Sequence, residues 1–268
     1  NYLAISERKD GLTQIHILNT IDNSSHYLKF DEAAYAANIA YIPDYNTDVM
    51  RYNYTSLTTP NSVYDYNMVT KEKKLMKQQE VIGSFKPADY ETERVMATAK
   101  DGTKIPISIV YKKGYKKDGN APLMLYGYGS YGASMEASFS SVRLSLLDRG
   151  FAYAIAHIRG GQEMGRYWYE DGKMMKKINT FTDFIDCAEF LLANKYTSKE
   201  HLYTSGGSAG GLLMGAVVNM RPDLWHAVIV GVPFVDVLTT MSDPTIPLTT
   251  NEYDEWGNPA NKENYMYI

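Results

Sequence analysis

The sequence contains a single cysteine, Cys187, among 268 residues. One thiol excludes a framework of internal disulfides and is typical of a reducing compartment or of a bacterial protein. Cys187 stands in the apolar helical pattern FIDCAEFLLA, which predicts a packed thiol rather than a reactive one. We therefore expect a cytoplasmic protein, with the bacterial periplasm as the alternative compartment.

Long apolar runs and a strong net charge are also lacking. No apolar run reaches the roughly 18 residues that a bilayer-spanning helix needs, and no signal peptide is visible. The formal net charge is −4, from 27 basic and 31 acidic side chains, which is too close to neutral to indicate a nucleic acid partner. We therefore expect neither a nucleic acid nor a membrane as partner.

The two ends of the sequence lack the features of natural termini. The chain begins with NYLAISERKDG, without a methionine, and it ends with NKENYMYI, without a closing element. We therefore expect a fragment of a longer protein that is cut at both ends. A chain of this length still buries a substantial core, as one large α/β domain or as two smaller units.

Residues 1–85 consist of short segments rich in aromatic and β-branched residues, separated by turn-like sequences. The segments are YLAIS, TQIHIL, HYLKF, ANIAYI, DVMRYNYTSL and SVYDYNM. Strands about 8 to 12 residues apart, without helices between them, predict an antiparallel all-β unit. A sandwich or a barrel fits this spacing. A few blades of a β-propeller are the sharper hypothesis, because TSLTTPNSVYDYNMVTKEKKLMKQ alternates strand and turn.

The pattern changes after the linker-like SFKPADYE, and residues 86–268 form the second predicted domain. ERVMATAKDGTKIPISIVYKK reads as a hairpin with a Lys-Asp-Gly turn. Strand-like and helical patterns then alternate, in the order PLMLYGYG, SSVRLSLLDRG, FAYAIAHI, TFTDFIDCAEFLLANK, LYTS, AGGLLMGAVVNM and HAVIVGVPF. This order predicts an α/β fold with a doubly wound, mostly parallel sheet. Because both faces of such a sheet are covered, its strands are apolar throughout.

The segment GGSAG, residues 206–210, fits the pattern G-x-S-x-G and lies between the predicted strand LYTS and a predicted helix. In this position Ser208 is a candidate nucleophile, because a sharp turn would lift its hydroxyl clear of the sheet. Gly206 and Gly210 remove the Cβ atoms that would otherwise collide there, and the Ala209 N–H becomes a candidate oxyanion donor. The alternatives are a plain glycine-rich turn or a phosphate-binding loop. A phosphate-binding loop is disfavoured, because no Walker lysine and no G-x-G-x-x-G follow.

The segment LYGYGSYG, residues 125–132, ends an earlier predicted strand of the sheet. Folds with the G-x-S-x-G turn draw their second oxyanion donor from such a place. For Tyr126, Tyr128 and Tyr131, aromatic packing is the alternative role.

The sequence offers Ser208 no evident base. In folds with this motif the acid and the histidine follow the serine, and His226 is the only histidine after Ser208. About 12 residues of helix at 1.5 Å each place it roughly 18 Å from the serine end, beyond hydrogen-bond reach. His157 ends an earlier strand and precedes the serine. Asp236 follows HAVIVGVPF at the right edge of the sheet, but a helix cap before VLTTM is the simpler role.

Several long blocks together resemble the prolyl oligopeptidase family and, more narrowly, its oligopeptidase B branch, also called protease II. The blocks are SLTTPNSVYDYN, LYGYGSYG, HIRGGQEMGRYWYEDG, KKINTFTDF, GGSAGGLLMGAVVNMRPDLW and VPFVDVLTTMSDPTIPLTTNEYDEWGNP. The resemblance covers essentially the whole chain. It implies the last blades of a seven-bladed β-propeller up to about residue 85. Most of an α/β-hydrolase domain then follows, without its C-terminal part.

The resemblance also implies roles for single residues. Ser208 is then the nucleophile, and the Tyr128 hydroxyl and the Ala209 N–H are the oxyanion donors. The triad acid and histidine lie beyond residue 268. The branch cleaves after Arg or Lys, and Glu252 and Asp254 in TTNEYDEW are implied to hold the basic side chain. Asp254 stands where a glutamate is usual, so its carboxylate reaches less far.

A second acidic pair in the branch is associated with a second basic residue of the substrate. Here MEASFS supplies Glu136 but has Ser138 at the other position, so we expect a weaker preference for paired basic residues. Tyr131 is a further candidate substrate-binding residue. The segment PTIPLTTNE has no aromatic residue where proline-cleaving relatives place one, which argues against prolyl specificity. We expect short basic peptides as substrates, and no cofactor or metal ion.

Two alternatives to a serine oligopeptidase stay open. One is an esterase or an aminopeptidase on the same fold, and the other is a non-catalytic binding module linked to a propeller. For residues 1–268 alone we expect no significant peptidase activity, because no general base is in range of Ser208.

Overall fold

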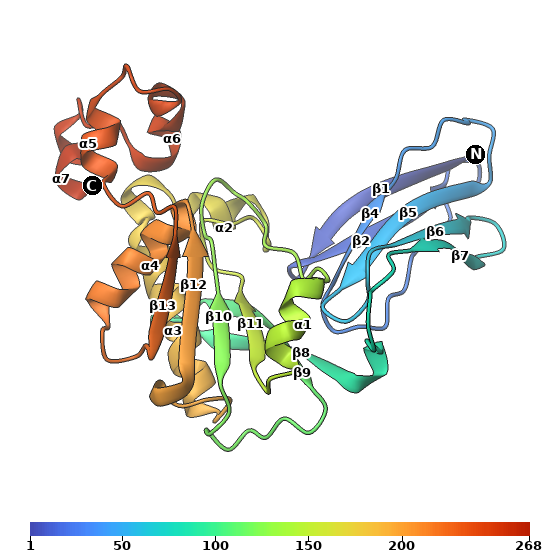
Figure 1. Ribbon diagram of the computed structural model, residues 1–268. Coiled ribbons are helices and arrows are strands. Elements are labelled where there is room, and N and C mark those ends of the chain that lie inside the picture. The colour runs from blue at the N-terminus through green and yellow to red at the C-terminus, as the bar shows by residue number, and fades with distance from the viewer.

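The computed structural model describes residues 1–268, which form thirteen strands and seven α-helices. The strands make three sheets. In Figure 1 the strands of residues 1–78 lie to the right of the sheet that the later strands form, and the last three helices lie above that sheet at the left. None of the helices is both long and apolar enough to cross a lipid bilayer.

Two antiparallel sheets make up the first part of the chain. Their strands are β1 (Tyr2–Lys9), β2 (Leu12–Asn19), β3 (Ser25–Tyr27), β4 (Tyr35–Ile39), β5 (Val49–Ser56), β6 (Ser62–Asn67) and β7 (Lys73–Gln78). The sheet orders are β1-β2-β3 and β4-β5-β6-β7. Alternate residues of β2 and β5 point into one shared core that includes Ile15, Ile17, Met50 and Tyr52. The predicted antiparallel all-β unit is confirmed.

The third sheet has the order β13-β12-β10-β11-β9-β8. Its strands are β8 (Tyr90–Thr98), β9 (Lys104–Lys112), β10 (Leu123–Tyr126), β11 (Ala152–Ala156), β12 (Leu202–Gly207) and β13 (Ala227–Gly231). β8 and β9 form the predicted antiparallel hairpin, and β10 to β13 run parallel to one another. β9 joins them antiparallel to β11, so the sheet is mixed and mostly parallel.

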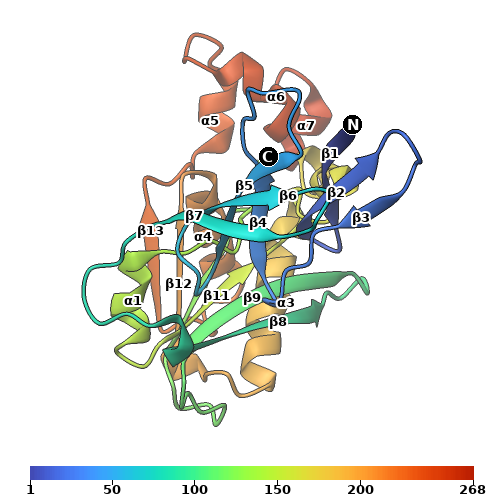
Figure 2. The ribbon, with the colours of Figure 1, turned by 90° about the vertical axis from the view of Figure 1, so that its right-hand side faces the viewer.

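Helices cover both faces of this sheet. The helices α3 (Ile178–Ala193) and α4 (Ala209–Met220) pack on one face, where Leu123, Leu125 and Ala154 point. The helix α1 (Ser141–Leu147) packs on the other face against Val110 and Ile155, as Figure 2 also shows. Burial on both faces explains the continuous apolar strands of the sequence. The exception is the edge strand β13, whose residues are half-buried or exposed.

Short helices complete the fold. They are α2 (Arg166–Glu170), α5 (Val237–Ser242), α6 (Tyr253–Trp256) and α7 (Lys262–Tyr267), with 3-10 turns η1 (Pro87–Asp89), η2 (Met174–Lys176), η3 (Lys199–His201) and η4 (Thr249–Glu252). α5, α6 and α7 lie above the upper ends of β12 and β13 in Figure 1, and the C-terminus lies among them. Between β7 and η1, residues 79–86 form no helix or strand. A domain boundary near residue 85 stays a prediction.

Candidate active site

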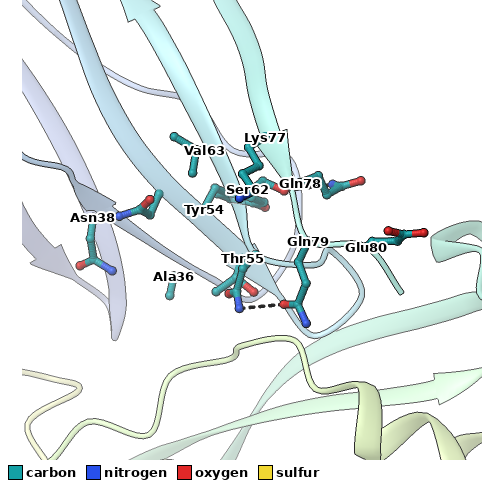
Figure 3. A pocket seen from close by; sticks show the side chains of 12 residues that line it. Ala36, Asn38, Tyr54, Thr55, Ser62, Val63, Lys77, Gln78, Gln79 and Glu80 are labelled. Atoms are coloured by element: carbon teal, nitrogen blue, oxygen red, sulfur yellow. Dashed lines mark hydrogen bonds between the residues drawn. The ribbon is translucent and has the colours of Figure 1, made fainter. Parts of the chain in front are cut away.

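A hollow of about 710 Å³ lies on the β4–β7 sheet (Figure 3). Its walls carry mainly amide and hydroxyl groups, and within the wall Asn61 donates a 3.0 Å hydrogen bond to Gln79. The lining contains no histidine and no cysteine. Its Ser62 hydroxyl donates to Pro60 O at 2.7 Å and its Thr55 hydroxyl to Thr59 O at 3.1 Å, so both are engaged by backbone, and size alone does not make it the candidate site.

Ser208 lies in the turn between β12 and α4, with φ 56° and ψ −121°. A positive φ strains a residue that has a Cβ atom, at a cost of about 1–3 kcal/mol. Backbone bonds hold the strain in place: the Ser208 N–H donates to Gly231 O at 3.0 Å, and the Ser208 carbonyl accepts from Phe234 N at 3.1 Å. The side chain is exposed at the carboxyl edge of the sheet. Ala209 is the first residue of α4, so its N–H has no acceptor within the helix.

Close backbone contacts exclude a Cβ at Gly206 and at Gly211 and leave little room for one at Gly210. A Cβ on Gly206 would lie 2.2 Å from Gly210 O, and one on Gly211 would lie 2.6 Å from Pro233 Cα. A Cβ on Gly210 would lie 3.0 Å from Gly127 O and 3.2 Å from Tyr128 Cδ2. The serine turn therefore packs directly against the segment that follows β10.

Tyr128 lies in that segment, beside Ser208. β10 is the parallel neighbour of β12, with Tyr126 opposite Ser205, so both strands end at the same edge of the sheet. Tyr128 is half-buried. Burial raises its pKa, and the neighbouring Ser208 hydroxyl acts in the opposite direction. At neutral pH Tyr128 is therefore protonated and can donate a hydrogen bond close to the serine oxygen.

A pocket of about 290 Å³ opens next to Ser208. Tyr131 and Glu252 form part of its wall, together with apolar residues that include Phe234 and Met241. Glu252 Oε2 accepts two hydrogen bonds of 2.8 Å, one from the Tyr131 hydroxyl and one from Trp256 Nε1. The pocket therefore combines a candidate nucleophile with a carboxylate whose orientation is fixed.

Two other sequence-based candidates lie elsewhere. Asp254 is exposed on α6 and is not part of the pocket wall. Glu136 forms an ion pair with Arg8 of β1, which joins the first sheet to the loop before α1. Of the candidate residues, the structure thus gathers Ser208, Ala209, Tyr128, Tyr131 and Glu252 in one place.

None of the histidines serves Ser208. His157 is buried, and its Nε2 lies 2.7 Å from Ser108 Oγ, while its Nδ1 lies 3.7 Å from a Glu163 oxygen. Ser108 is 1% exposed and Glu163 is 2% exposed, so this serine–histidine–carboxylate arrangement is closed to any substrate.

His226 lies far from Ser208, and Asp236 takes the simpler role of a helix cap, as the sequence predicts for both. The His226 N–H donates to the carbonyl of Leu202, which is the first residue of β12, so His226 lies at the end of β12 opposite to Ser208. Asp236 caps α5, because its side chain accepts a hydrogen bond from Thr239 N. His226 is therefore not placed to act as base for the serine.

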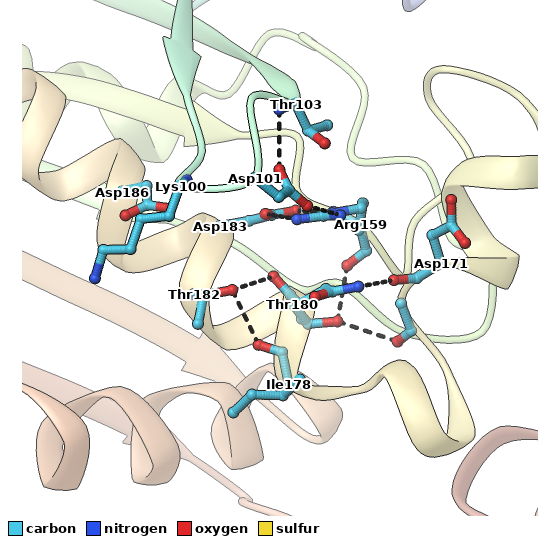
Figure 4. A network of polar contacts seen from close by, with 12 residues as sticks. Lys100, Asp101, Thr103, Arg159, Asp171, Ile178, Thr180, Thr182, Asp183 and Asp186 are labelled. Carbon is cyan, nitrogen blue, oxygen red and sulfur yellow. Dashed lines mark hydrogen bonds and ion pairs between the residues drawn. The ribbon is translucent and has the colours of Figure 1, made fainter.

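A buried ion pair fixes the loop that follows β11 (Figure 4). Arg159 donates to both carboxylate oxygens of Asp183 on α3, at 2.8 and 2.6 Å, and to Asp101 in the β8–β9 turn at 2.7 Å. The next residue, Gly160, lies so close to Gly129 that a Cβ would be 2.0 Å from its carbonyl oxygen. The Arg159–Asp183 pair therefore fixes the loop at Gly160, which packs against the segment that carries Tyr128.

Lys177 is a buried cation that no pattern in the sequence predicts. Its Nζ donates to Gly129 O and Ser130 Oγ at 2.7 Å and to Gly172 O and Glu255 Oε1 at 3.2 Å. Burial lowers its pKa to about 8, although Glu255 opposes the shift. The sequence does not distinguish Lys177 from Lys176, the residue directly before it. Lys176 is exposed and pairs with Asp171.

The strained serine, the sheet order and the helices on both faces define an α/β-hydrolase fold behind two antiparallel sheets. A family model described as "Prolyl oligopeptidase family" matches residues 137–268, and one described as "Prolyl oligopeptidase, N-terminal beta-propeller domain" matches residues 1–79. The chain belongs to the prolyl oligopeptidase family. The family, the α/β-hydrolase fold and the propeller segment predicted from the sequence are confirmed.

Named relatives agree with this assignment. The chain is 54% identical over its full length to dipeptidyl aminopeptidase BI of Pseudoxanthomonas mexicana and spans 37% of that protein. It is 44% identical over 99% of its length to protease 2 of Moraxella lacunata and spans 38% of it. The structure of oligopeptidase B from Leishmania major matches the whole chain with a TM-score of 0.92 and 47% identity, and 39% of that protein is covered. The chain thus spans about two fifths of these relatives.

Proposed function

We propose that residues 1–268 belong to a longer serine peptidase that cleaves short peptides after Arg or Lys. One observation carries the proposal: the exposed hydroxyl of strained Ser208 and the carboxylate of Glu252 line the same pocket. A carboxylate in a pocket binds a guanidinium through charge-assisted hydrogen bonds. In such a site the basic side chain of the substrate places the next carbonyl at the serine.

The reaction is an acyl transfer in two steps. Ser208 Oγ attacks the carbonyl carbon after the basic residue, and the Tyr128 hydroxyl and the Ala209 N–H stabilise the negative charge that develops on the carbonyl oxygen. The amine leaves with a proton, and an acyl-enzyme remains on Ser208. Water then attacks this ester and releases the acid. Glu252, supported by Asp254 from the exposed side of α6, holds the basic side chain throughout.

The base and the acid that activate Ser208 come from outside residues 1–268 in this proposal. Within these residues no histidine lies at the serine, since His157 is engaged by Ser108 and His226 lies at the far end of β12. Residues 1–268 alone are then inactive as a peptidase, apart from the residual catalysis of the oxyanion donors. The antiparallel sheets of residues 1–85 belong to a propeller that restricts entry to short peptides, and residues 86–268 carry the catalytic site.

Replacing Ser208 with Ala in the full-length protein tests the proposal. The variant is expected to lose cleavage of a blocked arginyl reporter peptide and to lose labelling by an active-serine phosphonate. The matched control is Ser205→Ala, three residues earlier on β12. Wild-type turnover by the Ser208→Ala protein removes this serine from the reaction. A wild-type protein that neither labels nor cleaves is a binding module instead.

The second candidate is an aminopeptidase, which the 54% identity to dipeptidyl aminopeptidase BI favours. An enzyme that needs a free amino terminus does not cut a peptide whose N-terminus is acetylated. We therefore compare an arginyl peptide with and without an acetyl group. Equal cleavage of both forms supports the endopeptidase, and cleavage of the free form alone supports the aminopeptidase.

A further inference from the structure

The ammonium group of Lys177 lies between two parts of the molecule that the proposed reaction uses separately. One is the segment after β10 that carries Tyr128, and the other is α6, which follows Glu252 directly. The Lys177 residue is only 6% exposed. Water therefore does not compete for its hydrogen bonds, and each contact fixes a position.

The first contact is with the segment after β10. Lys177 Nζ donates at 2.7 Å to the carbonyl of Gly129, the residue directly after Tyr128, and at 2.7 Å to Ser130 Oγ. Gly129 has φ +73°, and a Cβ there would lie 2.4 Å from Thr180 Cγ2, so the backbone has little freedom to relax. Loss of the ammonium would leave the carbonyl of Gly129 without its charged donor. The direction of the Tyr128 side chain depends on this backbone.

The second contact is with α6. Lys177 Nζ lies 3.2 Å from Glu255 Oε1 and 4.9 Å from the centre of the Trp256 ring. Trp256 in turn donates to Glu252 Oε2 and packs edge-on against Tyr131, with ring centres 5.8 Å apart. A cation over an aromatic face is held by the ring quadrupole. The same ammonium therefore fixes the residue that orients the Glu252 carboxylate.

We propose that Lys177 is a positioning residue that couples the oxyanion donor Tyr128 to the specificity carboxylate Glu252. This inference rests on the proposed peptidase function. Lys177 touches neither the substrate nor Ser208. It sets the distance between the place where charge develops on the carbonyl oxygen and the place where the basic side chain is held. Both must be correct at once for an arginyl substrate to react.

The test uses the full-length protein and two blocked ester substrates, one arginyl and one citrullinyl. Citrulline has the shape of arginine without its charge, so the ratio of the two kcat/KM values reports on Glu252, and kcat on either ester reports on the oxyanion donors. All rates are divided by the number of sites that a phosphonate titrates. The variants are Lys177→Met, Glu255→Gln and Ser130→Ala. The matched control is Lys176→Met, which removes an exposed lysine one position away.

Lys177→Met is expected to lower kcat per titrated site roughly 10- to 100-fold on both esters and also to lower the preference for arginyl over citrullinyl. Glu255→Gln is expected to lower the preference for arginyl over citrullinyl and to leave kcat on the citrullinyl ester near wild type. Ser130→Ala is expected to lower kcat on both esters and to leave the preference near wild type. Lys176→Met is expected to match wild type in both quantities.

The inference is overturned if Lys177→Met keeps wild-type rates per titrated site and loses only the number of sites, since that is a purely structural effect. It is also overturned if kcat falls while the preference is unchanged. Should Lys177→Met yield no folded protein, Glu255→Gln and Ser130→Ala decide, and wild-type values for both reject the coupling. The Ser208→Ala protein distinguishes failure of this inference from failure of the proposed function. Full turnover by Ser208→Ala would reject the peptidase reaction itself, whatever the Lys177 variants do.

Discussion

The Tyr131 hydroxyl donates a 2.8 Å hydrogen bond to Oε2 of Glu252, although 121 positions of sequence separate the two residues. Trp256 Nε1 donates to the same oxygen. The carboxylate is therefore oriented without a ligand, and its Oε1 has no donor within the protein. A pre-oriented carboxylate loses little freedom when a guanidinium binds, which favours affinity.

Glu252→Gln removes the charge of this carboxylate and nearly keeps its shape. We expect kcat/KM for an arginyl substrate to fall roughly 100-fold, because a charged group in the pocket would be left unpaired. For the citrullinyl analogue we expect little change. Steady-state kinetics on the full-length protein measure both values. A proportional loss on both substrates would mean that Glu252 does not recognise the basic side chain.

Asp254→Asn is the companion variant. Asp254 is exposed and lies outside the pocket wall, so its charge is screened by water. We expect a loss of only a few-fold on the arginyl substrate, and the loss should shrink further when salt is raised to about 0.5 M. An effect equal to that of Glu252→Gln would place Asp254 in direct contact with the substrate.

Tyr128→Phe removes the proposed oxyanion donor and keeps the ring that packs on Gly210. We expect kcat to fall about 100- to 1,000-fold with little change in KM, because the hydroxyl stabilises charge that develops only in the transition state. Tyr126→Phe is the matched control, since the Tyr126 hydroxyl contacts only Met135 Sδ, at 3.8 Å. Equal kcat values for the two variants would exclude Tyr128 as a donor.

Regular elements could be predicted from the sequence because their signals are local. The alternation in β2 and β5, the hairpin turn at residues 99–103 and the strand-to-helix turn at Ser208 each depend on a few neighbouring residues. The glycines at 206 and 210 in the sequence indicate close packing: a Cβ at Gly206 would collide with backbone, and one at Gly210 would have little room. The role of Cys187 as a packed thiol followed from its helical pattern in the same way, and it is fully buried.

Contacts between distant segments could not be predicted in this way. Lys176 and Lys177 are equivalent in the sequence, and only the packing of η2 against α6 and the Gly129 segment decides which lysine is buried. Glu136 was placed by resemblance alone, and its partner Arg8 lies on a strand 128 positions earlier. Its part in substrate binding stays a prediction.

Gly206→Ala tests the turn that presents the serine. Its new Cβ would lie 2.2 Å from the Gly210 carbonyl oxygen, so backbone must move, at a cost of about 1–3 kcal/mol. Gly207→Ala is the control, because the nearest atom to its Cβ is a carbonyl oxygen at 3.5 Å. We expect a lower urea midpoint and lost phosphonate labelling for Gly206→Ala alone. Equal behaviour of the two variants would mean that the turn is looser than the contacts indicate.

Deprotonation of the buried Lys177 ammonium at alkaline pH is expected to have opposite effects on stability and on activity. Burial lowers its pKa from 10.5 to about 8, while Glu255 opposes the shift. Glu255 is the charged group that faces it, and the remaining partners are the carbonyls of Gly129 and Gly172 and the hydroxyl of Ser130. Between about pH 8 and 10.5 the folded protein therefore binds fewer protons at this site than the unfolded chain does.

By linkage, the free energy of unfolding rises with pH across that window relative to Lys177→Met, by about 2–3 kcal/mol at pH 10. Activity per titrated site falls across the same window, because a neutral amine has only two protons for four acceptors. Urea midpoints and arginyl ester rates, taken from pH 7.5 to 10 for both proteins, measure the two trends. Parallel midpoint curves for wild type and Lys177→Met would show that the lysine keeps its charge throughout. A rise in stability without a fall in activity would show that the charge is not needed for positioning.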